Sequence, residues 1–167
     1  MNAFTQLRSL SVGDVVTVPS GVPHALQHGV RVIEFQTPVY ERKILSFAQR
    51  VLTQPHWDTR EAAAKMSLDL PADPSFEVLV ARDGVRAERI ALFPDFSVER
   101  VQLTPGARYA LQTTPHCLAT TVMGAVEIQS SRIAAGQACL VPGTLHGTIL
   151  RNSGAAAAVA LIARPNP

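Results

Sequence analysis

Turn-forming dipeptides divide the C-terminal part of the chain into short segments in which apolar and β-branched residues predominate. These segments have the length of strands and are 88–93, 96–103, 118–129, 137–141, 148–151 and 156–163. The turns include Asp83-Gly84, Pro94-Asp95, Pro105-Gly106, Ala135-Gly136 and Pro142-Gly143. Short strands separated by turns at close intervals are typical of β-sandwiches and small barrels. The pattern therefore predicts an all-β barrel over residues 76–167.

Residues 155–158 are four consecutive alanines, a composition that would also suit a helix. Gly154 precedes them, however, and Val159, Leu161 and Ile162 follow, which favours a buried strand. We expect a strand at 156–163.

The N-terminal part of the chain contains two further strand patterns, at 15–18 and 25–36. Both are rich in β-branched residues, and Pro-Ser-Gly and His-Gly interrupt them. This composition predicts consecutive short antiparallel strands. We interpret residues 1–52 as a partial half-barrel.

Residues 53–75 connect the two β parts. Asp58 and Glu61 have the spacing of a helix capping box, and residues 62–65 are strong helix formers. One short helix is expected from 58 to 66. Pro71 and Pro74 then mark a linker, because each proline lacks a backbone donor and restricts the residue before it.

Composition limits the classes of protein to which the chain can belong. It has 167 residues, 47% of them hydrophobic, which suffices for one good core. A net charge of +2 with scattered arginines and 5% aromatic residues argues against a nucleic-acid partner. No apolar run reaches the roughly 18 residues of a membrane span, and the N-terminus lacks a leader pattern. We expect a cytoplasmic protein with no membrane partner, and its two cysteines, Cys117 and Cys139, are expected to be reduced.

One spacing of glycine, proline and histidine carries chemical information. Gly13, Pro19, Gly21 and His24 form the pattern G-x5-P-x-G-x2-H, which places one imidazole at the start of a strand. Gly136 and Pro142 repeat its first half, but the histidine that follows, His146, arrives one residue early. The weak repeat is consistent with two related β units in one chain.

This spacing resembles the second conserved motif of the cupins, which are small double-stranded β-helix barrels. A longer run is similar to type I mannose-6-phosphate isomerases: Val-Pro-Ser-Gly-Val-Pro-His-Ala-Leu at 18–26, Gly-Val-Arg-Val-Ile-Glu-Phe-Gln at 29–36, and then Pro38. The specific match covers about the first third of the chain. The remainder resembles the metal-free C-terminal cupin domain of that family only in pattern. The implied fold is a cupin jelly-roll barrel with an additional N-terminal half-barrel and one short connecting helix.

The resemblance also implies roles for individual residues. His24 would bind zinc or another divalent metal at the mouth of a barrel, His28 is a further candidate ligand, and Glu34 would be a catalytic carboxylate. Gln36 shares a strand face with Glu34 and is a candidate substrate contact. The implied reaction is the aldose-ketose isomerisation of a sugar phosphate, in which a metal polarises the sugar and a base moves a proton between neighbouring carbons.

Two features of the family's site are missing. A substrate-binding arginine of the family would fall at Ile44, so Arg42 and Lys43 are the nearest candidates for its catalytic role. The family's other metal ligands lie upstream of the motif, where this chain has twelve residues before Gly13. Because a catalytic zinc normally takes three protein ligands, His24 is expected to hold a metal only weakly.

Each candidate also has a purely structural interpretation, in which His24 caps a strand start, Glu34 faces solvent and His28 is an exposed turn residue. Two functions therefore stay open. One is an isomerase-like enzyme whose missing ligands come from another chain, and the other is a non-catalytic cupin with a sugar-binding, regulatory or structural role. The unpaired edges of a half-barrel also favour a homodimer formed through it.

Overall fold

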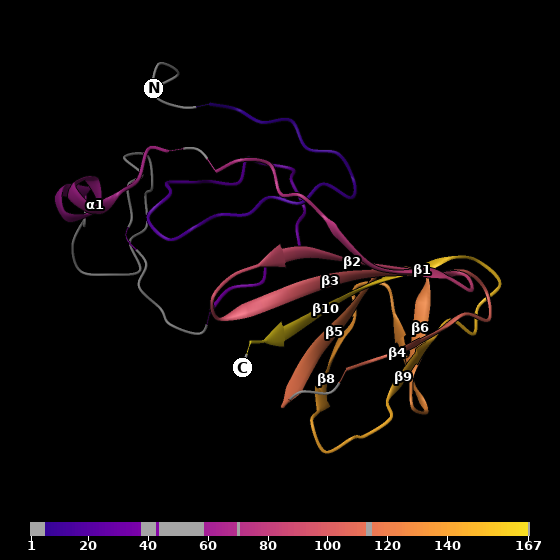
Figure 1. Ribbon diagram of the computed structural model, residues 1–167. Helices are drawn as coiled ribbons and strands as arrows, with labels where there is room; N and C mark the ends of the chain where they lie inside the picture. The colour runs from indigo at the N-terminus through magenta and orange to yellow at the C-terminus, as the bar shows by residue number, and fades with distance from the viewer. Residues whose placement is uncertain (1–5, 38–42, 44–58, 70, 113–114, 167) are drawn as a thin grey trace.

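The computed structural model describes residues 6–37, 43, 59–69, 71–112 and 115–166, and its regular elements within them are one helix and ten strands. They are α1 (Thr59–Lys65), β1 (Glu77–Arg82), β2 (Val85–Leu92), β3 (Phe96–Leu103), β4 (Arg108–Ala110), β5 (His116–Met123), β6 (Ala125–Ile128), β7 (Ser131–Ala134), β8 (Ala138–Pro142), β9 (Ile149–Arg151) and β10 (Ala158–Pro165). Figure 1 shows that the strands gather in the C-terminal part of the chain. The predicted all-β class with one short helix is confirmed.

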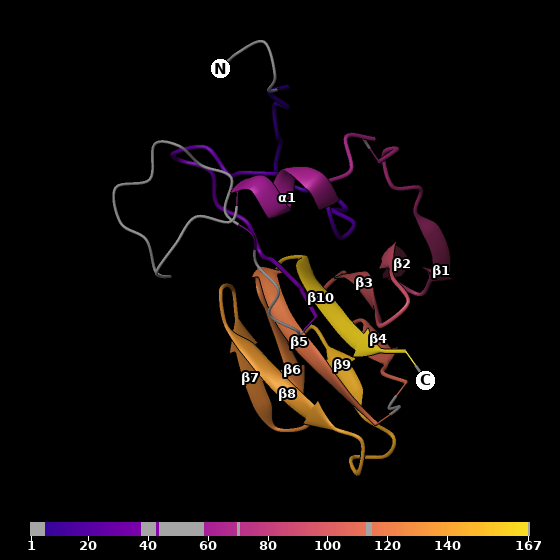
Figure 2. The same ribbon diagram turned by 90° about the vertical axis from the view of Figure 1, so that its left-hand side faces the viewer.

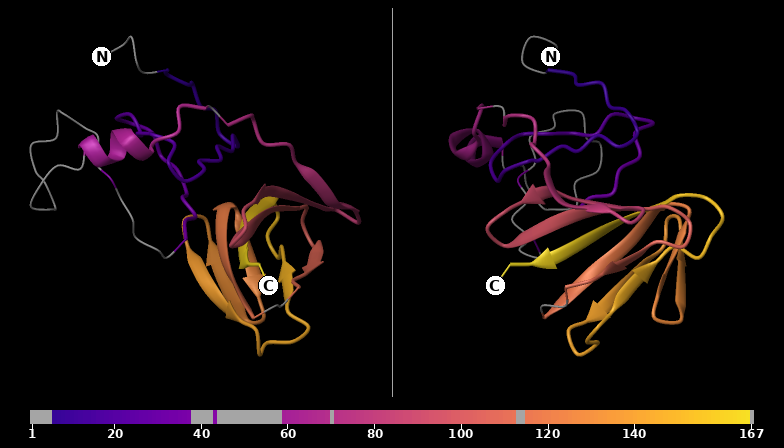
Figure 3. Two further views of the ribbon diagram at one scale, coloured as in Figure 1. Left: turned by 60° about the vertical axis from the view of Figure 1, so that its left-hand side comes forward. Right: turned by 45° about the vertical axis from the view of Figure 1, so that its right-hand side comes forward.

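The strands form two sheets that face each other across one hydrophobic core (Figures 1 and 3). One sheet has the order β1-β2-β3-β10-β5-β8, and the other has the order β4-β9-β6-β7. Val101 and Ile162 from the first sheet and Val126 and Leu150 from the second are at most 1% exposed. The barrel expected from the sequence is not closed, because each sheet keeps two edges. Among the described residues a single bridge, Thr121 to Ala135, links β5 to the residue after β7.

The turn chemistry of the sequence explains the first hairpin. Asp83 and Gly84 have φ values of 51° and 75°, and they join β1 to β2 as the two central residues of a tight hairpin turn. Positive φ at both positions matches the right-handed twist of the flanking strands and favours the Asp-Gly pair. The turn predicted here is confirmed.

Strand β10 lies in the middle of the six-stranded sheet, between β3 and β5. Its alternate residues Ala158, Ala160 and Ile162 face the other sheet and are at most 1% exposed. Small side chains at this face let the two sheets approach closely. The prediction of a strand rather than a helix is confirmed, although the strand begins at Ala158.

The single helix, α1, agrees with the helix predicted at 58–66. Lys65 Nζ donates to Glu61 Oε1 at 2.9 Å, one turn away, and Lys43 Nζ lies 3.0 Å from the same oxygen. These two hydrogen bonds lower the pKa of Glu61 to about 2. In the described part of the chain no helix has the length and apolarity that crossing a bilayer requires.

Residues 6–37, here called the N-terminal arm, contain no strand, so the strands expected at 15–18 and 25–36 are wrong. The arm's backbone hydrogen bonds close local turns, such as Val22 N to Pro19 O, or reach the segment after α1, as Ser67 N does to Gly21 O. A β-branched run becomes a strand only where a neighbouring strand offers a ladder, and the arm's described contacts provide none. The half-barrel assigned to residues 1–52 extends beyond the described residues and stays a prediction.

The arm lies over the outer face of the six-stranded sheet, the face turned away from β6, β7 and β9 (Figure 2). Val15 and Phe35 of the arm pack against Ile90, Val98 and Ala163, which form a second, smaller apolar cluster. These contacts bring the sequence motif next to the sandwich without inserting it between the sheets.

Candidate functional site

The structure keeps the predicted site residues of the arm apart from the core of the protein. His24, His28, Glu34 and Gln36 are all exposed. His24 Nδ1 lies 3.0 Å from the carbonyl oxygen of Val22, two residues earlier. Arg42 lies outside the described residues, and Lys43 pairs with Glu61.

The donors of the arm do not form a metal site in the described part of the chain, where no three histidine, cysteine, aspartate or glutamate side chains come together as a metal-binding group. His24 is a single imidazole, and its Nδ1 lies within hydrogen-bond distance of its own loop. A catalytic zinc normally needs three protein ligands and one open position. The described donors therefore do not fit the zinc centre that the resemblance implies.

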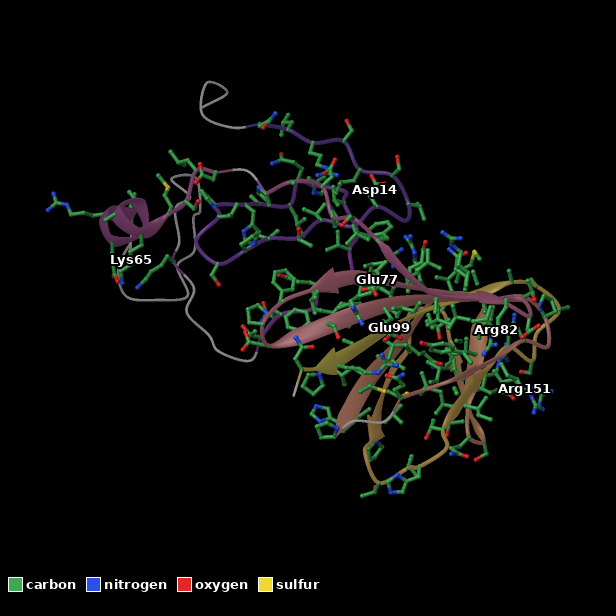
Figure 4. All side chains as sticks on the ribbon, in the orientation of Figure 1. Asp14, Lys65, Glu77, Arg82, Glu99 and Arg151 are labelled. Carbon is green, nitrogen blue, oxygen red and sulfur yellow. The ribbon has the colours of Figure 1, made fainter. Side chains whose placement is uncertain are left out.

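A different group of polar side chains lies between the two sheets. We call Glu99, Tyr109 and Arg164 the interior cluster. On β3, Glu99 alternates with Val101 and Leu103 and shares their inward face, and on β10, Arg164 continues the inward row of Ala160 and Ile162. Figure 4 shows Glu99 on the side of β3 toward β5, opposite Asp14 of the arm. Strand periodicity alone places both charges inside.

The interior cluster is tightly hydrogen-bonded. Arg164 Nη1 donates to Glu99 Oε1, and the two side chains are only 7% and 9% exposed. Tyr109 Oη donates to Glu99 Oε2 at 3.0 Å, and Arg164 Nε donates to the backbone oxygen of Gln112 at 3.1 Å. A buried pair needs such additional hydrogen bonds, because its attraction must offset the loss of hydration.

One atom of the cluster has no partner. Arg164 Nη2 is buried and makes no hydrogen bond to any described residue. Leaving a charged donor unsatisfied in a protein interior is costly, so such an atom calls for an explanation.

Burial shifts the pKa values of two neighbouring groups. Burial, and next the Glu99 carboxylate, raise the pKa of Tyr109 to about 12, so its hydroxyl remains a donor. Burial also raises the pKa of the Cys117 thiol, which lies at the inward face of β5. Both shifts favour the protonated forms of the Tyr109 hydroxyl and the Cys117 thiol.

A row of alternating charges leads from the sheet edge to the cluster. Glu77 of β1 is in register with Arg89 of β2, which is in register with Glu99 of β3. Arg89 Nη1 lies 2.5 Å from Glu77 Oε2, and this outer pair is more exposed than the pair of Glu99 and Arg164. Each carboxylate of the row is paired with an arginine, so neither the exposed pair nor the buried pair carries a net charge.

A second ionic group lies on the outer face of the same sheet. Arg100 Nη2 lies 2.9 Å from Glu88 Oε2, and Arg100 Nη1 donates to the backbone oxygen of Gly13 at 2.9 Å. The guanidinium also lies 4.9 Å from the centre of the Phe76 ring. Arg100 thus fixes the first glycine of the sequence motif to the sandwich.

A surface hollow of about 430 Å³ lies at the other end of the sheet, beside the hairpin turn of β1 and β2. Its lining includes Arg82, Arg86 and Gln102, and Arg86 is already paired with Glu88. It contains no residue of the motif or of the interior cluster, so we do not assign the site to it.

Comparison with solved structures identifies the fold. The mannose 6-phosphate isomerase from Bacillus subtilis aligns over 65% of this chain and 34% of its own, with a TM-score of 0.50 and 13% identity. A sugar phosphate isomerase of the cupin superfamily from Silicibacter pomeroyi aligns over 56% and 72%, with a TM-score of 0.45 and 18% identity. An RmlC-like cupin from Shewanella frigidimarina aligns over 56% and 85%, with a TM-score of 0.44 and 13% identity. The chain has a cupin fold.

At these identities the likeness establishes the cupin fold and nothing finer. The chain spans about a third of the Bacillus enzyme. No protein-family model matches the sequence, and no curated protein matches it either.

The interior cluster of this cupin fold was not among the residues selected from the sequence. The signal that would have found Glu99 is its place in the strand alternation, since it stands in phase with the apolar Val101 and Leu103. Arg164 is likewise in phase with Ala160 and Ile162. A charge in the inward phase of a strand is rare enough to be informative.

Proposed function

We propose that this chain is a non-catalytic cupin of isomerase ancestry that binds a sugar phosphate or a related carbohydrate. The observation that carries the proposal is the interior cluster. Ligand sites in β-barrels and sandwiches concentrate a few placed polar groups in an otherwise apolar interior, and Glu99, Tyr109 and Arg164 are such groups. An aligned carboxylate and guanidinium suit the hydroxyl-rich surface of a sugar.

The sugar class of the ligand is supported by two further observations. The run at 18–36 resembles type I mannose-6-phosphate isomerases, and the fold aligns with the Bacillus enzyme of that name. In this proposal Glu34, Gln36, Arg42 and Lys43 are remnants of a catalytic and substrate-binding surface. They would act in isomerisation only if another chain supplied the missing ligands.

The proposal includes a weak metal site. His24, with His28 four residues away, would contribute one imidazole to zinc or another divalent cation, too few ligands to hold the metal firmly. A homodimer formed through the N-terminal residues would bring a second His24 to such a site. The cytoplasm, expected from the sequence, is the proposed place of action.

Calorimetric titration of the full chain with mannose-6-phosphate, fructose-6-phosphate and mannose tests the proposal, together with a coupled isomerase assay in added zinc. We expect saturable sugar binding, less than one zinc retained per chain after dialysis, and no conversion. His24→Ala should lower the retained zinc further, whereas His116→Ala, a change at an exposed histidine outside the motif, should not.

Two results would overturn the proposal. Steady turnover at one zinc per chain would make the protein an isomerase in its own right. Absence of binding for all three sugars would remove the carbohydrate ligand altogether.

A further inference from the structure

The geometry points to Arg164 Nη2 as the docking point for an uncharged sugar hydroxyl, not for the phosphate of a sugar phosphate. The inference rests on the proposed function, since it specifies which part of the carbohydrate enters the interior. It follows from the unpartnered donor, the charge balance of the cluster and the place of Arg164 at the end of its strand.

The donor is oriented by the rest of its own guanidinium. Nη1 is held by Glu99 and Nε by the Gln112 carbonyl, so Nη2 is fixed by the two bonds beside it. The Arg164 side chain is 7% exposed, and Nη2 is the one of its three nitrogens that lacks a hydrogen-bond partner. A rigid, desolvated donor gains more from an incoming oxygen than a surface arginine does, because it gives up no hydration and little side-chain freedom.

The charge balance of the cluster determines which kind of oxygen can bind to Arg164 Nη2. The Arg164 cation is already compensated by Glu99, which also accepts a hydrogen bond from Tyr109. A phosphate dianion at Nη2 would stand close to the Glu99 carboxylate in a medium of low dielectric, where repulsion between like charges is strong. A neutral acceptor carries no such penalty.

A hydroxyl fits better than any other neutral oxygen. It can accept from Nη2 and still has a proton to donate. Each carboxylate oxygen of Glu99 takes part in one hydrogen bond, and a carboxylate oxygen has lone pairs for two. The pair of Glu99 and Arg164 therefore offers a donor and an acceptor side by side, which is what a sugar hydroxyl requires.

Arg164 lies close to one end of the sandwich. It is the last residue but one of β10, so its side chain lies at an end of the sandwich and not at the middle. Gln112, whose carbonyl oxygen holds Nε, is itself exposed. The inference therefore requires that this end of the sandwich opens far enough for a ligand to reach the buried Nη2.

The decisive experiment observes Arg164 in the unmodified protein. Full-length chain labelled with ¹⁵N-arginine is titrated with mannose, mannose-6-phosphate and inorganic phosphate while the guanidinium signals are followed by NMR; Arg164→Lys assigns the Arg164 signals. We expect both sugars to shift these signals with affinities within about threefold of each other, because the phosphate contributes little there. Inorganic phosphate should cause no shift. The signals of Arg151, an exposed arginine of β9, serve as the internal control and should not move.

A variant gives a second, independent measurement. Arg164→Lys keeps the cation near Glu99 but removes the planar fork, and we expect sugar affinity to fall about tenfold, the effect of losing one hydrogen bond to a charged group. Arg151→Lys, a matched change at an exposed arginine of β9, should leave affinity unchanged. If Arg164→Lys does not fold, the Arg164 signals can be assigned in the unmodified chain through the hydrogen bond from Nε to the Gln112 carbonyl. The titration then tests the inference without the variant.

The results that would overturn this inference differ from those that would overturn the proposed function. Sugar binding that leaves the Arg164 signals unmoved, or a shift produced by inorganic phosphate, overturns this inference and leaves the proposed function standing. Absence of any sugar binding overturns the proposed function and this inference with it. Arg164 signals that report exchange with a trapped water, and no response to sugar, would show that water alone satisfies Nη2.

Discussion

Strand β3 carries two consecutive charged residues whose partners lie on opposite faces of the sheet. Glu99 pairs inward with Arg164 of β10, and Arg100 pairs outward with Glu88 of β2. The inner side chains are 9% and 7% exposed, and the outer ones are 6% for Glu88 and 17% for Arg100. One strand thus contributes to a buried pair on its inner face and to a partly buried pair on its outer face.

The two pairs differ in what covers them. The inner pair is enclosed by the second sheet and by the hydrogen bond from Tyr109, all parts of the sandwich. The outer pair lies under the N-terminal arm, which contributes the Gly13 carbonyl and has no strand of its own. The same chemistry therefore stabilises the sandwich on one face and on the other fixes the arm that carries the histidine motif.

Replacing Arg164 should have the largest effect on stability. Arg164→Met removes the cation and leaves Glu99 buried without compensation, which we expect to lower the free energy of unfolding by about 3–5 kcal/mol. Urea unfolding of the two proteins measures the change. Arg151→Met, at an exposed position of β9, should stay within about 0.5 kcal/mol of the unmodified protein.

A second substitution separates charge from packing in this result. Adding Glu99→Gln to Arg164→Met removes the uncompensated carboxylate and should restore much of the loss. A double variant as unstable as Arg164→Met alone would mean that lost packing, not charge, causes the effect.

Replacing Arg100 should have a smaller effect on global stability but a marked local one. Glu88 keeps Arg86 as a partner, whose Nη2 lies 2.6 Å from Glu88 Oε1, so we expect Arg100→Met to cost about 2 kcal/mol. Hydrogen exchange should become faster in the arm near Gly13 and stay unchanged in β10.

The control for this substitution is Arg82→Met. Arg82 is exposed on β1, and its Nε lies 4.0 Å from Asp83 Oδ2. Its loss should change the free energy of unfolding by no more than about 0.5 kcal/mol and should leave hydrogen exchange in the arm unchanged. If Arg100→Met left exchange near Gly13 unaltered, the other contacts of the arm, such as those of Val15 and Phe35, would suffice to hold it.

Local sequence signals predicted the sandwich better than the arm. The segment predicted at 96–103 coincides with β3, and Asp83-Gly84 marked a hairpin, because turn residues and alternation are local properties. The runs at 15–18 and 25–36 have equally strong β composition, yet they form no strand. Their state depends on whether a neighbouring backbone is available, and composition does not encode this.

The pair of Glu99 and Arg164 likewise could not be predicted from local sequence alone. Glu99 and Arg164 are 65 residues apart in the chain, and their contact exists because β10 pairs with β3. Alternation could place each charge inward, but the pairing order of the strands decided that they meet. His24 shows the converse, since a specific motif predicted a ligand whose described surroundings contain no ligand partners.

The smallest of the expected effects is the contribution of Glu88, in the outer pair, to the loss of stability at acidic pH. The hydrogen bond from Arg100, and with it that from Arg86, lowers the pKa of Glu88 against the opposing effect of burial. A carboxylate whose pKa is lower in the folded state than its usual value of 4.5 contributes stability that is complete above that value. The contribution is lost as the pH falls below 4.5 through the folded-state pKa.

Glu88→Gln should therefore flatten the decline of stability with falling pH below 4.5, measured by urea unfolding in a pH series. The matched Glu127→Gln, at a partly exposed carboxylate of β6, serves as the control for losing one carboxylate. A Glu88→Gln curve parallel to that of the unmodified protein would mean that Glu88 does not cause the decline of stability below pH 4.5.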